Sequence, residues 1–304
     1  MMTMVAKIVS NKEQLRLNEP MARYTSWRVG GNAKQYYKPA DLDSLVDFLQ
    51  QLPVDEPLYW LGLGSNMLIR DGGIDGTVID MKGVNQTIEA LGDNRIKFDA
   101  GVTCSKAAKF CARNNMGGAE FLAGIPGTIG GALAMNAGAF EGETWNHVHT
   151  VNTIDRFGQL HTRKPDQFTV GYRLVKALNR SEPEWFVSAE FEFHDALDEA
   201  GKQRIKMLLE KRNNSQPIGL ASCGSVFTNP ENDYAARLIE SVGLKGYCIG
   251  QACVSEKHAN FIINTGGATA TDIESLILYI QAQVLAKTAV ELHTEVRVIG
   301  EKLS

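Results

Sequence analysis

The stretch FLAGIPGTIGGALAMNAGAF, residues 121–140, decides how the fold of this 304-residue chain is interpreted. Its uncharged residues reach the length of a membrane span. They nevertheless include Pro126, Asn136 and five glycines. Proline and glycine strongly disfavour an isolated helix. We therefore expect a glycine-rich loop here and no membrane insertion.

A second glycine-rich loop, GLGSN at residues 62–66, follows the apolar run 58–61. Consecutive amides without bulky side chains form a concave site for phosphate oxygens. Neither loop is a G-x-G-x-x-G fingerprint or a P-loop, because residue 67 is Met and no G-K-[ST] follows. The two loops together predict a nucleotide-like cofactor, and tight turns alone remain the alternative.

The charge balance and the cysteine pattern exclude several classes of protein. A formal net charge of -4 argues against nucleic acid as a partner. The five cysteines have no C-x-x-C spacing, so we expect reduced thiols and neither a disulfide framework nor a zinc site. The six histidines show no metal-ligand spacing. The N-terminal residues offer no apolar h-region or small-residue cleavage site, so we expect no signal peptide. We expect a cytoplasmic protein without a metal.

Hydrophobic periodicity indicates an α+β chain. We expect helices over 41–52, 103–116, 196–214, 232–242 and 272–287, and strands over 58–63, 76–81, 95–99, 148–162 (a hairpin), 185–194 and 290–299. Asp41 is expected to cap the first helix, and Thr271 with Glu274 to form a capping box for the last. The segment NNSQPIG, near 212–220, is the expected linker.

Several motifs resemble those of the UDP-N-acetylenolpyruvoylglucosamine reductase family and follow one another in the same order as in that family. The resemblance is to the compact form of the family and extends from about residue 20 to residue 301. The motifs are YTSWRVGG (24–31), the two glycine loops, VGYR (170–173), GSVFTNP (224–230), VSEKHANFIIN (254–264) and ELHTEVRVIGE (291–301). The resemblance implies a two-subdomain FAD-binding body of the vanillyl-alcohol-oxidase (PCMH) type and a smaller α+β substrate-binding domain. The expected boundaries are an N-terminal extension at 1–20, a body at 21–211 divided near 85/86, and a C-terminal domain at 212–304.

The activity implied is reduction of UDP-N-acetylglucosamine enolpyruvate to UDP-N-acetylmuramate, in peptidoglycan precursor synthesis. It needs noncovalent FAD, NADPH as co-substrate and a UDP-sugar, and we expect a monomer. The residues expected to hold the cofactor are Gly62, Leu63, Gly64, Ser65, Asn66, Met67, Gly124, Ile125, Pro126, Gly127, Thr128, Gly130, Gly131, Ala132, Asn136 and Gly138. Another flavoprotein of the same body type and a non-catalytic nucleotide-sugar sensor are the competing hypotheses.

The resemblance also assigns the chemistry. Hydride would reach C3 of the enolpyruvyl group, Ser225 would protonate C2, and Arg173 and Glu295 would stabilise the enolate. Each has an alternative from the residues alone: Ser225 as a turn residue, Arg173 as a solvated strand charge, and Glu295 on the solvent-facing side of the final strand. Cys223, with an intrinsically lower pKa than serine, is a rival proton donor.

Substrate contacts are expected from a further group of residues, namely Tyr172, Gly224, Asn229, Lys257 and His258. Tyr172 could equally be a core ring, and Lys257 and His258 could be surface residues. Leu174 and Val175 stand where the family commonly has a serine two residues after the arginine.

Overall fold

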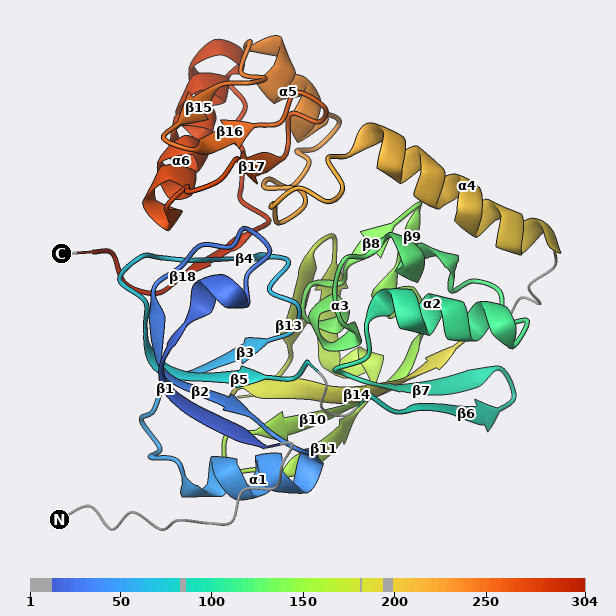
Figure 1. Ribbon diagram of the computed structural model, residues 1–304. Coiled ribbons are helices and arrows are strands. Elements are labelled where there is room, and N and C mark those ends of the chain that lie inside the picture. The colour runs from blue at the N-terminus through green and yellow to red at the C-terminus, as the bar shows by residue number, and fades with distance from the viewer. Residues whose placement is uncertain (1–12, 83–85, 181, 194–198, 304) are drawn as a thin grey trace, which may run out of the picture.

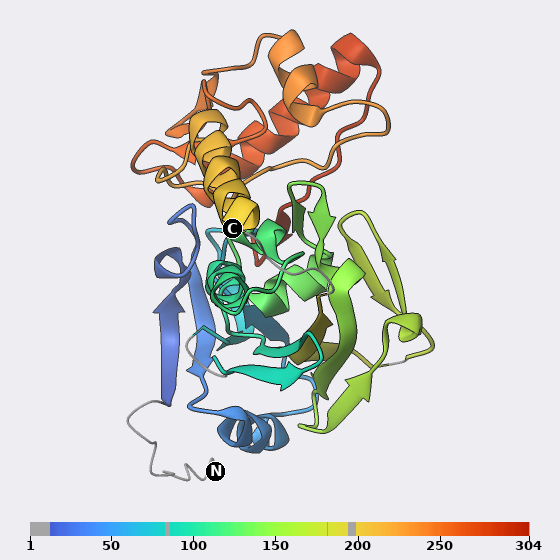
Figure 2. The same cartoon turned by 90° about the vertical axis from the view of Figure 1, so that its right-hand side faces the viewer.

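The computed structural model describes residues 13–82, 86–180, 182–193 and 199–303. Two β-sheets from the first two thirds of the chain lie side by side, and the C-terminal domain sits above them (Figure 1). Figure 2 shows the long helix α4 (Glu199–Ser215) leading from the body to that domain. The arrangement is the expected α+β architecture.

The first sheet has the strand order β1-β2-β5-β3. β2 and β3 each pair in parallel with β5, whereas β1 is antiparallel to β2. The bounds are Gln14–Pro20 for β1, Asn32–Lys38 for β2, Leu58–Leu61 for β3 and Ile74–Asp80 for β5. Helix α1 (Leu42–Gln51) follows β2, and the Asp41 side chain accepts a hydrogen bond from Ser44 N at 2.8 Å. The expected helix and its cap are confirmed.

The second sheet is antiparallel, in the order β11-β10-β14-β7-β6. Its bounds are Ile88–Gly92 for β6, Arg95–Asp99 for β7, Val148–Asp155 for β10, Leu160–Arg163 for β11 and Glu184–Glu192 for β14. Helices α2 (Cys104–Arg113) and α3 (Ile129–Met135) pack against this region, and the small hairpins are β8 (Gly138–Ala139) with β9 (Gly142–Glu143) and β12 (Phe168–Gly171) with β13 (Leu174–Ala177). The glycine-rich stretch 121–140 thus contains a short helix beside this sheet.

A shared hydrophobic cluster joins the two sheets. Leu45 and Leu49 of α1 pack with Ile79 of the first sheet and with Ile154 and Val187 of the second. All five side chains are almost inaccessible to solvent. Burying apolar surface between the sheets fixes their relative orientation. The loops that leave the two sheets are therefore also fixed relative to one another.

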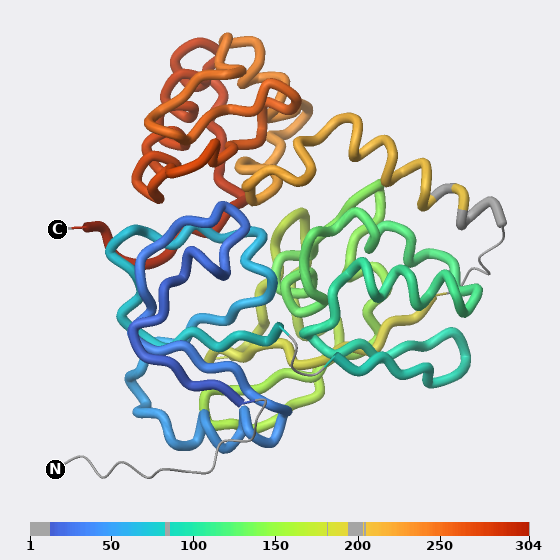
Figure 3. Tube along the Cα trace, viewed as in Figure 1, coloured from blue at the N-terminus to red at the C-terminus, as the bar shows by residue number. Residues whose placement is uncertain are grey.

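The C-terminal domain packs helices against a small antiparallel sheet. Its elements are α5 (Ala235–Ser241), β15 (Cys248–Ile249), β16 (Ala252–Val254), β17 (Ile262–Asn264) and α6 (Ala270–Thr288). The chain then returns to the body, as the red end of the tube in Figure 3 shows. There β18 (Arg297–Ile299) pairs in parallel with β4 (Met67–Ile69). Trp27 and Leu68 of the body belong to the hydrophobic core of this domain.

The ends of the expected domains differ from the structure. Residues 14–20, expected in an N-terminal extension, form strand β1, because their backbone pairs along β2. Only 297–299 of the expected strand 290–299 are extended in a sheet. In residues 290–296, Leu292 and Val296 are buried in the core, but the pairing with residue 227 is a single bridge at Thr294. The first residues of the expected helix 196–214 lie outside the described residues.

The capping box of α6 lies two residues earlier in the sequence than expected. Thr269 caps the helix and Asp272 completes the reciprocal bonds. Glu274 instead accepts two hydrogen bonds from Arg70, both at 2.9 Å. Thr271 donates its hydroxyl to Asp71 at 2.7 Å. Contacts with the body therefore decide which of two overlapping sequence patterns forms the cap.

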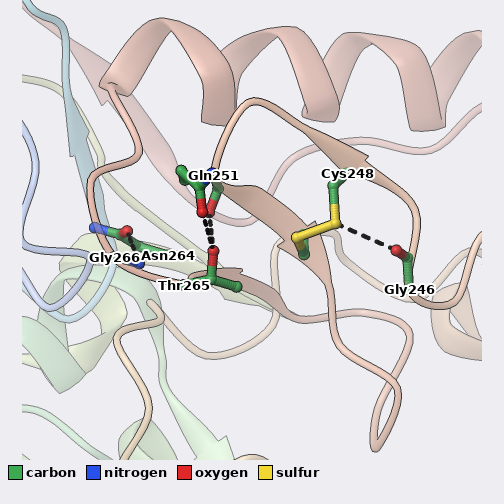
Figure 4. Close-up of a disulfide and its surroundings, with 7 residues drawn as sticks. Gly246, Cys248, Gln251, Asn264, Thr265 and Gly266 are labelled. Carbon is green, nitrogen blue, oxygen red and sulfur yellow. Dashed lines mark hydrogen bonds between the residues drawn. A yellow bond between two sulfur atoms is a disulfide. The ribbon is translucent and has the colours of Figure 1, made fainter.

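The expectation of reduced thiols throughout is wrong. Cys248 and Cys253 form a disulfide, shown in Figure 4. The physical reason is the hairpin between β15 and β16, which makes these residues direct cross-strand partners with their Cα atoms 4.1 Å apart. Cys104, Cys111 and Cys223 are free and buried.

Candidate active site

A cavity of about 580 Å³ lies where the glycine-rich loops meet the C-terminal domain. The residues expected to hold the cofactor line it, except Gly130, which lines an adjoining cavity, and Asn136. Ser225, Arg173 and Glu295 line the same cavity, although they come from well-separated parts of the chain. The structure thus brings the expected catalytic residues and the glycine loops together.

Both glycine loops border open space, and the first loop also leaves backbone amides unused. Gly64 has φ +60°, and an added Cβ there would lie 2.0 Å from the carbonyl oxygen of Tyr24. A Cβ on Gly127 or Gly131 would meet nothing closer than 3.6 Å, so these positions leave the cavity open. The backbone N–H groups of residues 63–66 donate to none of the described residues. Unused amides around an open space fit phosphate oxygens, as FAD would present.

Arg173 lies at the tip of the β12–β13 hairpin in a left-handed backbone conformation. Its guanidinium donates to Glu295 Oε1 at 3.2 Å and to the carbonyl oxygens of Asn136 and Gly138, both at 3.3 Å. The side chain is 19% exposed, so it is not a solvated strand charge. These bonds use only part of the guanidinium's N–H donors, and others remain for an anionic ligand.

Glu295 is largely, though not fully, withdrawn from solvent beside Arg173. Its side chain is 13% exposed, and its backbone N–H donates to Val226 O at 2.8 Å. Burial raises the pKa of the Glu295 carboxyl, and the Arg173 charge acts against that rise. The neutral carboxyl, which can donate a hydrogen bond, is therefore easier to form here than in water.

Ser225 follows Gly224, whose φ of +74° turns the chain at the wall of the cavity. None of the described residues forms a hydrogen bond with the Ser225 hydroxyl. The neighbouring Cys223 thiol donates to Met67 O at 3.4 Å, and burial raises its pKa to about 12. Burial therefore weakens the Cys223 thiol as an acid, since a thiol away from water resists losing its proton, and whether Cys223 could replace Ser225 as the donor stays a prediction.

Four of the expected substrate residues lie outside this lining. Tyr172 is half exposed and stacks on the Arg173 guanidinium, whose Cζ is 5.0 Å from the ring centroid. The Asn229 side chain accepts from Ala235 N, at the start of α5. Lys257 Nζ donates to Asn213 O, and the His258 ring packs edge-on against Phe261. Their substrate roles stay predictions.

The Asn136 side chain forms hydrogen bonds within the protein and does not line the cavity. Its side chain donates to Gly171 O at 3.1 Å and accepts from Trp145 N at 3.0 Å. Gly171 begins the hairpin turn that carries Arg173. Asn136 therefore helps to position the Arg173 guanidinium in two ways, through its side-chain bond to Gly171 O and through its own carbonyl oxygen, which accepts from Arg173 Nη1.

Sequence reasoning missed Arg212 and Gln216, which line the cavity from the end of α4 and the linker. Arg212 Nε donates to Gln216 Oε1 at 3.1 Å, and burial lowers the Arg212 pKa. Arg212 lies where the expected helix 196–214 overlaps the expected linker near 212–220, and this place at an inter-domain boundary is the signal that the sequence offers.

The adjoining cavity measures about 320 Å³. The residues that line both cavities are Trp60, Gly62, Thr128, Gly131, Ala134, Trp185 and Arg297. The other walls of the smaller cavity include Phe168, Phe186 and Arg180. Within the described residues, no helix is long and apolar enough to cross a membrane, and no group of three or more acidic, His or Cys side chains could hold a metal.

Comparisons with known proteins agree with this geometry. Residues 216–299 match the family model described as UDP-N-acetylenolpyruvoylglucosamine reductase, C-terminal domain, and residues 33–163 match the model described as FAD binding domain. The UDP-N-acetylenolpyruvoylglucosamine reductase of Methylococcus capsulatus is 55% identical over 93% of this chain and 92% of its own length. The one from Legionella pneumophila strain Corby is 54% identical over 97% and 95%.

A solved structure extends the likeness to three dimensions. The crystal structure of UDP-N-acetylenolpyruvylglucosamine reductase from Thermus caldophilus aligns with a TM-score of 0.78 at 29% identity, covering 94% of this chain and 98% of that one. Both the sequence and the fold therefore match an FAD-dependent oxidoreductase along nearly their whole length. The chain belongs to the UDP-N-acetylenolpyruvoylglucosamine reductase family.

Proposed function

We propose that this flavoprotein reduces UDP-N-acetylglucosamine enolpyruvate to UDP-N-acetylmuramate with NADPH, as a monomer in the cytoplasm, where peptidoglycan precursors are made. The observation that carries the proposal is the convergence of Ser225, Arg173 and Glu295 on the cavity that the glycine loops line. An FAD site beside an arginine, a buried carboxyl and a hydroxyl suits reduction of an alkene that bears a carboxylate.

Bound FAD would accept a hydride from NADPH and supply it to C3 of the enolpyruvyl group. As that carbon gains hydride, negative charge develops on C2 and on the adjoining carboxylate, as an enolate. The Arg173 guanidinium, held by three acceptors, is a fixed cation for this charge. It need not reorganise when the charge appears, which makes its stabilisation more effective than that of solvent.

Glu295 would assist the same charge as a neutral acid. Burial favours its protonated form, which can donate a hydrogen bond to the enolate oxygens while the Arg173 N–H groups bind them. A second anion at this point would oppose the reaction, so the raised pKa of Glu295 is what makes a carboxyl useful here.

Ser225 would deliver the proton to C2. It lines the cavity and its hydroxyl has no hydrogen-bond partner among the described residues, so the hydroxyl is available to a ligand. A positioned acid of this kind contributes about 10² to 10⁴ in rate.

The test is stopped-flow absorbance of the flavin band, with NADPH added first and the enolpyruvyl UDP-sugar second. Wild type, Ser225→Ala and the matched control Cys223→Ala should all bleach alike with NADPH. Reoxidation by the UDP-sugar should be about 10² to 10⁴ slower in Ser225→Ala alone. Equally fast reoxidation of Ser225→Ala would remove Ser225 as the donor, and a protein without bleachable flavin would refute the whole proposal.

A further inference from the structure

Ser225, the proposed proton donor, is directly followed by two buried residues. Val226 and Phe227 are each only 1% exposed. On the other side of Ser225, an added Cβ on Gly224 would meet nothing within 4 Å, so the chain borders open space there. The place of the Ser225 hydroxyl in the cavity therefore depends on what holds the backbone of residues 226 and 227.

Asn260 holds both of these residues. Its side-chain Nδ2 donates to Phe227 O at 2.8 Å, and its Oδ1 accepts from Phe227 N at 2.9 Å. Its backbone carbonyl oxygen accepts from Val226 N at 2.9 Å. Asn260 is itself only 4% exposed, so water does not compete for these bonds. An amide that uses its donor and its acceptor on one residue restrains both the place and the orientation of that residue's backbone.

Glu295 has anchors of its own. Its backbone N–H donates to Val226 O at 2.8 Å, but its carbonyl oxygen also accepts from Asn66 Nδ2 at 3.1 Å. Its carboxyl accepts from Arg173 Nε at 3.2 Å. The Ser225 hydroxyl has no such bond within the part of the chain that the structure describes. Loss of the amide that holds residues 226 and 227 should therefore displace Ser225 more than Glu295.

We propose that Asn260 is a positioning residue for the proton transfer, and that its buried amide holds Ser225 in the place from which the hydroxyl would protonate C2. Asn260 is not part of the cavity lining, so it acts through Ser225 and not on a ligand. The inference rests on the proposed function, which gives Ser225 the role of proton donor. Misplacing a reacting group by about 1 Å costs about 10² in rate.

The first experiment is amide hydrogen exchange on the full-length holoprotein, which needs no substrate. Asn260→Ala is compared with the matched control Asn264→Ala. Asn264, in the neighbouring strand β17, also binds backbone with both amide atoms: it donates to Trp27 O and accepts from Gly266 N, both at 2.9 Å (Figure 4 shows the second bond). Asn260→Ala should speed exchange at residues 226 and 227 about 10-fold. Asn264→Ala should leave exchange at these two residues as in wild type.

The second experiment is a double-mutant cycle with Ser225→Ala, read as reoxidation of the reduced flavin by the enolpyruvyl UDP-sugar. With Ser225 present, Asn260→Ala should slow the limiting rate about 10- to 100-fold. Bleaching by NADPH and the half-saturating concentration of the UDP-sugar should stay as in wild type. In the Ser225→Ala background, Asn260→Ala should change the limiting rate by less than about threefold, because the hydroxyl that it positions is absent. Asn264→Ala should leave the limiting rate unchanged.

A second variant, Asn260→Asp, serves if Asn260→Ala does not fold. A neutral carboxyl has an acceptor and an O–H donor, as the amide has, whereas a carboxylate would face Phe227 O without a donor. The limiting rate of Asn260→Asp, divided by the wild-type rate at the same pH, should therefore rise from pH 8 to pH 5. His258, whose Nδ1 accepts from Asn260 N, and Glu295 titrate in wild type as well, so the ratio separates the new carboxyl from them. An equally low ratio at both pH values would contradict the inference.

Two further results would overturn the inference. Equal slowing by Asn260→Ala with and without the Ser225 hydroxyl would make Asn260 a structural residue only. Unchanged exchange at residues 226 and 227 in Asn260→Ala would show that the amide does not hold them. A wild-type protein whose reduced flavin is not reoxidised by the enolpyruvyl UDP-sugar would refute the proposed function instead, and the exchange experiment would still test what Asn260 holds.

Discussion

Replacing Arg173 by Gln should destabilise the protein much more at pH 8 than at pH 5. The side chains of Arg173 and Glu295 are 19% and 13% exposed, so the substitution leaves a buried carboxylate without its cation. Removing one partner of a buried pair costs about 3 to 5 kcal/mol. Because both side chains retain some contact with solvent, we expect about 3 kcal/mol at pH 8, the low end of that range.

The direction of the pH dependence follows from the carboxyl. Burial raises the pKa of Glu295 in the folded protein, and the Arg173 charge lowers it in part. The stability that this group contributes is therefore fully present below its unfolded pKa and is lost as pH rises through the folded pKa. Without Arg173 the folded pKa rises further, and the loss continues to higher pH. At pH 5 more of the carboxyl is neutral than at pH 8, and a neutral carboxyl needs no cation, so the cost of the substitution should be smaller at pH 5.

The assay is urea unfolding followed by tryptophan fluorescence, at one fixed FAD concentration so that ligand binding contributes equally. The matched variants are Glu295→Gln and the double variant Arg173→Gln/Glu295→Gln. The double variant should recover most of the stability that Arg173→Gln loses at pH 8, since no carboxylate is stranded in it. An equal loss for Arg173→Gln at both pH values, or a double variant no more stable than Arg173→Gln, would refute this account of the pair.

Two further predictions concern the C-terminal hairpin and the first glycine loop. Cys248→Ser/Cys253→Ser should lower the free energy of unfolding by about 2 kcal/mol, the loop-entropy value for so short a loop. Dithiothreitol should lower the free energy of unfolding of wild type by the same amount. If dithiothreitol also destabilised the double variant, its effect could not be assigned to this disulfide. Gly64→Ala should lose bound flavin, because its Cβ would lie 2.0 Å from Tyr24 O. Gly219→Ala, also at positive φ but in open space, should cost about 1 kcal/mol and keep its flavin; normal absorbance of Gly64→Ala near the flavin band would contradict the steric argument.

The features that depend on local sequence were predictable. The Asp41 cap, the helix after it and the glycine loop at 62–66 are each specified by a few consecutive residues, and the structure has them where expected. The proposed catalytic residues came from the family motifs, and the structure places Ser225 and Arg173 in one cavity. Residue patterns alone left their roles open.

The features that failed depend on contacts between distant segments. The alternating pattern of residues 290–299 left open that Glu295 faces solvent, because it does not show the partner of this carboxyl, Arg173, which is 122 residues away. Glu274 has the correct spacing for a capping box, yet it binds Arg70 of the body. Asn136 has an amide that suits a cofactor, but the hairpin uses that amide. A single sequence does not show which partner a polar side chain will meet.

The C-terminal segment that returns to the body contacts the first glycine loop, and this affects the order in which the site can form. Asn66, the last residue of the first glycine loop, accepts from Arg297 N at 3.1 Å and donates to Glu295 O at 3.1 Å. The strand directly after this loop, β4, has β18 as its partner. On the ribosome, residues 62–66 are made long before residues 295–299. The first glycine loop therefore lacks these contacts until almost the entire chain has been made.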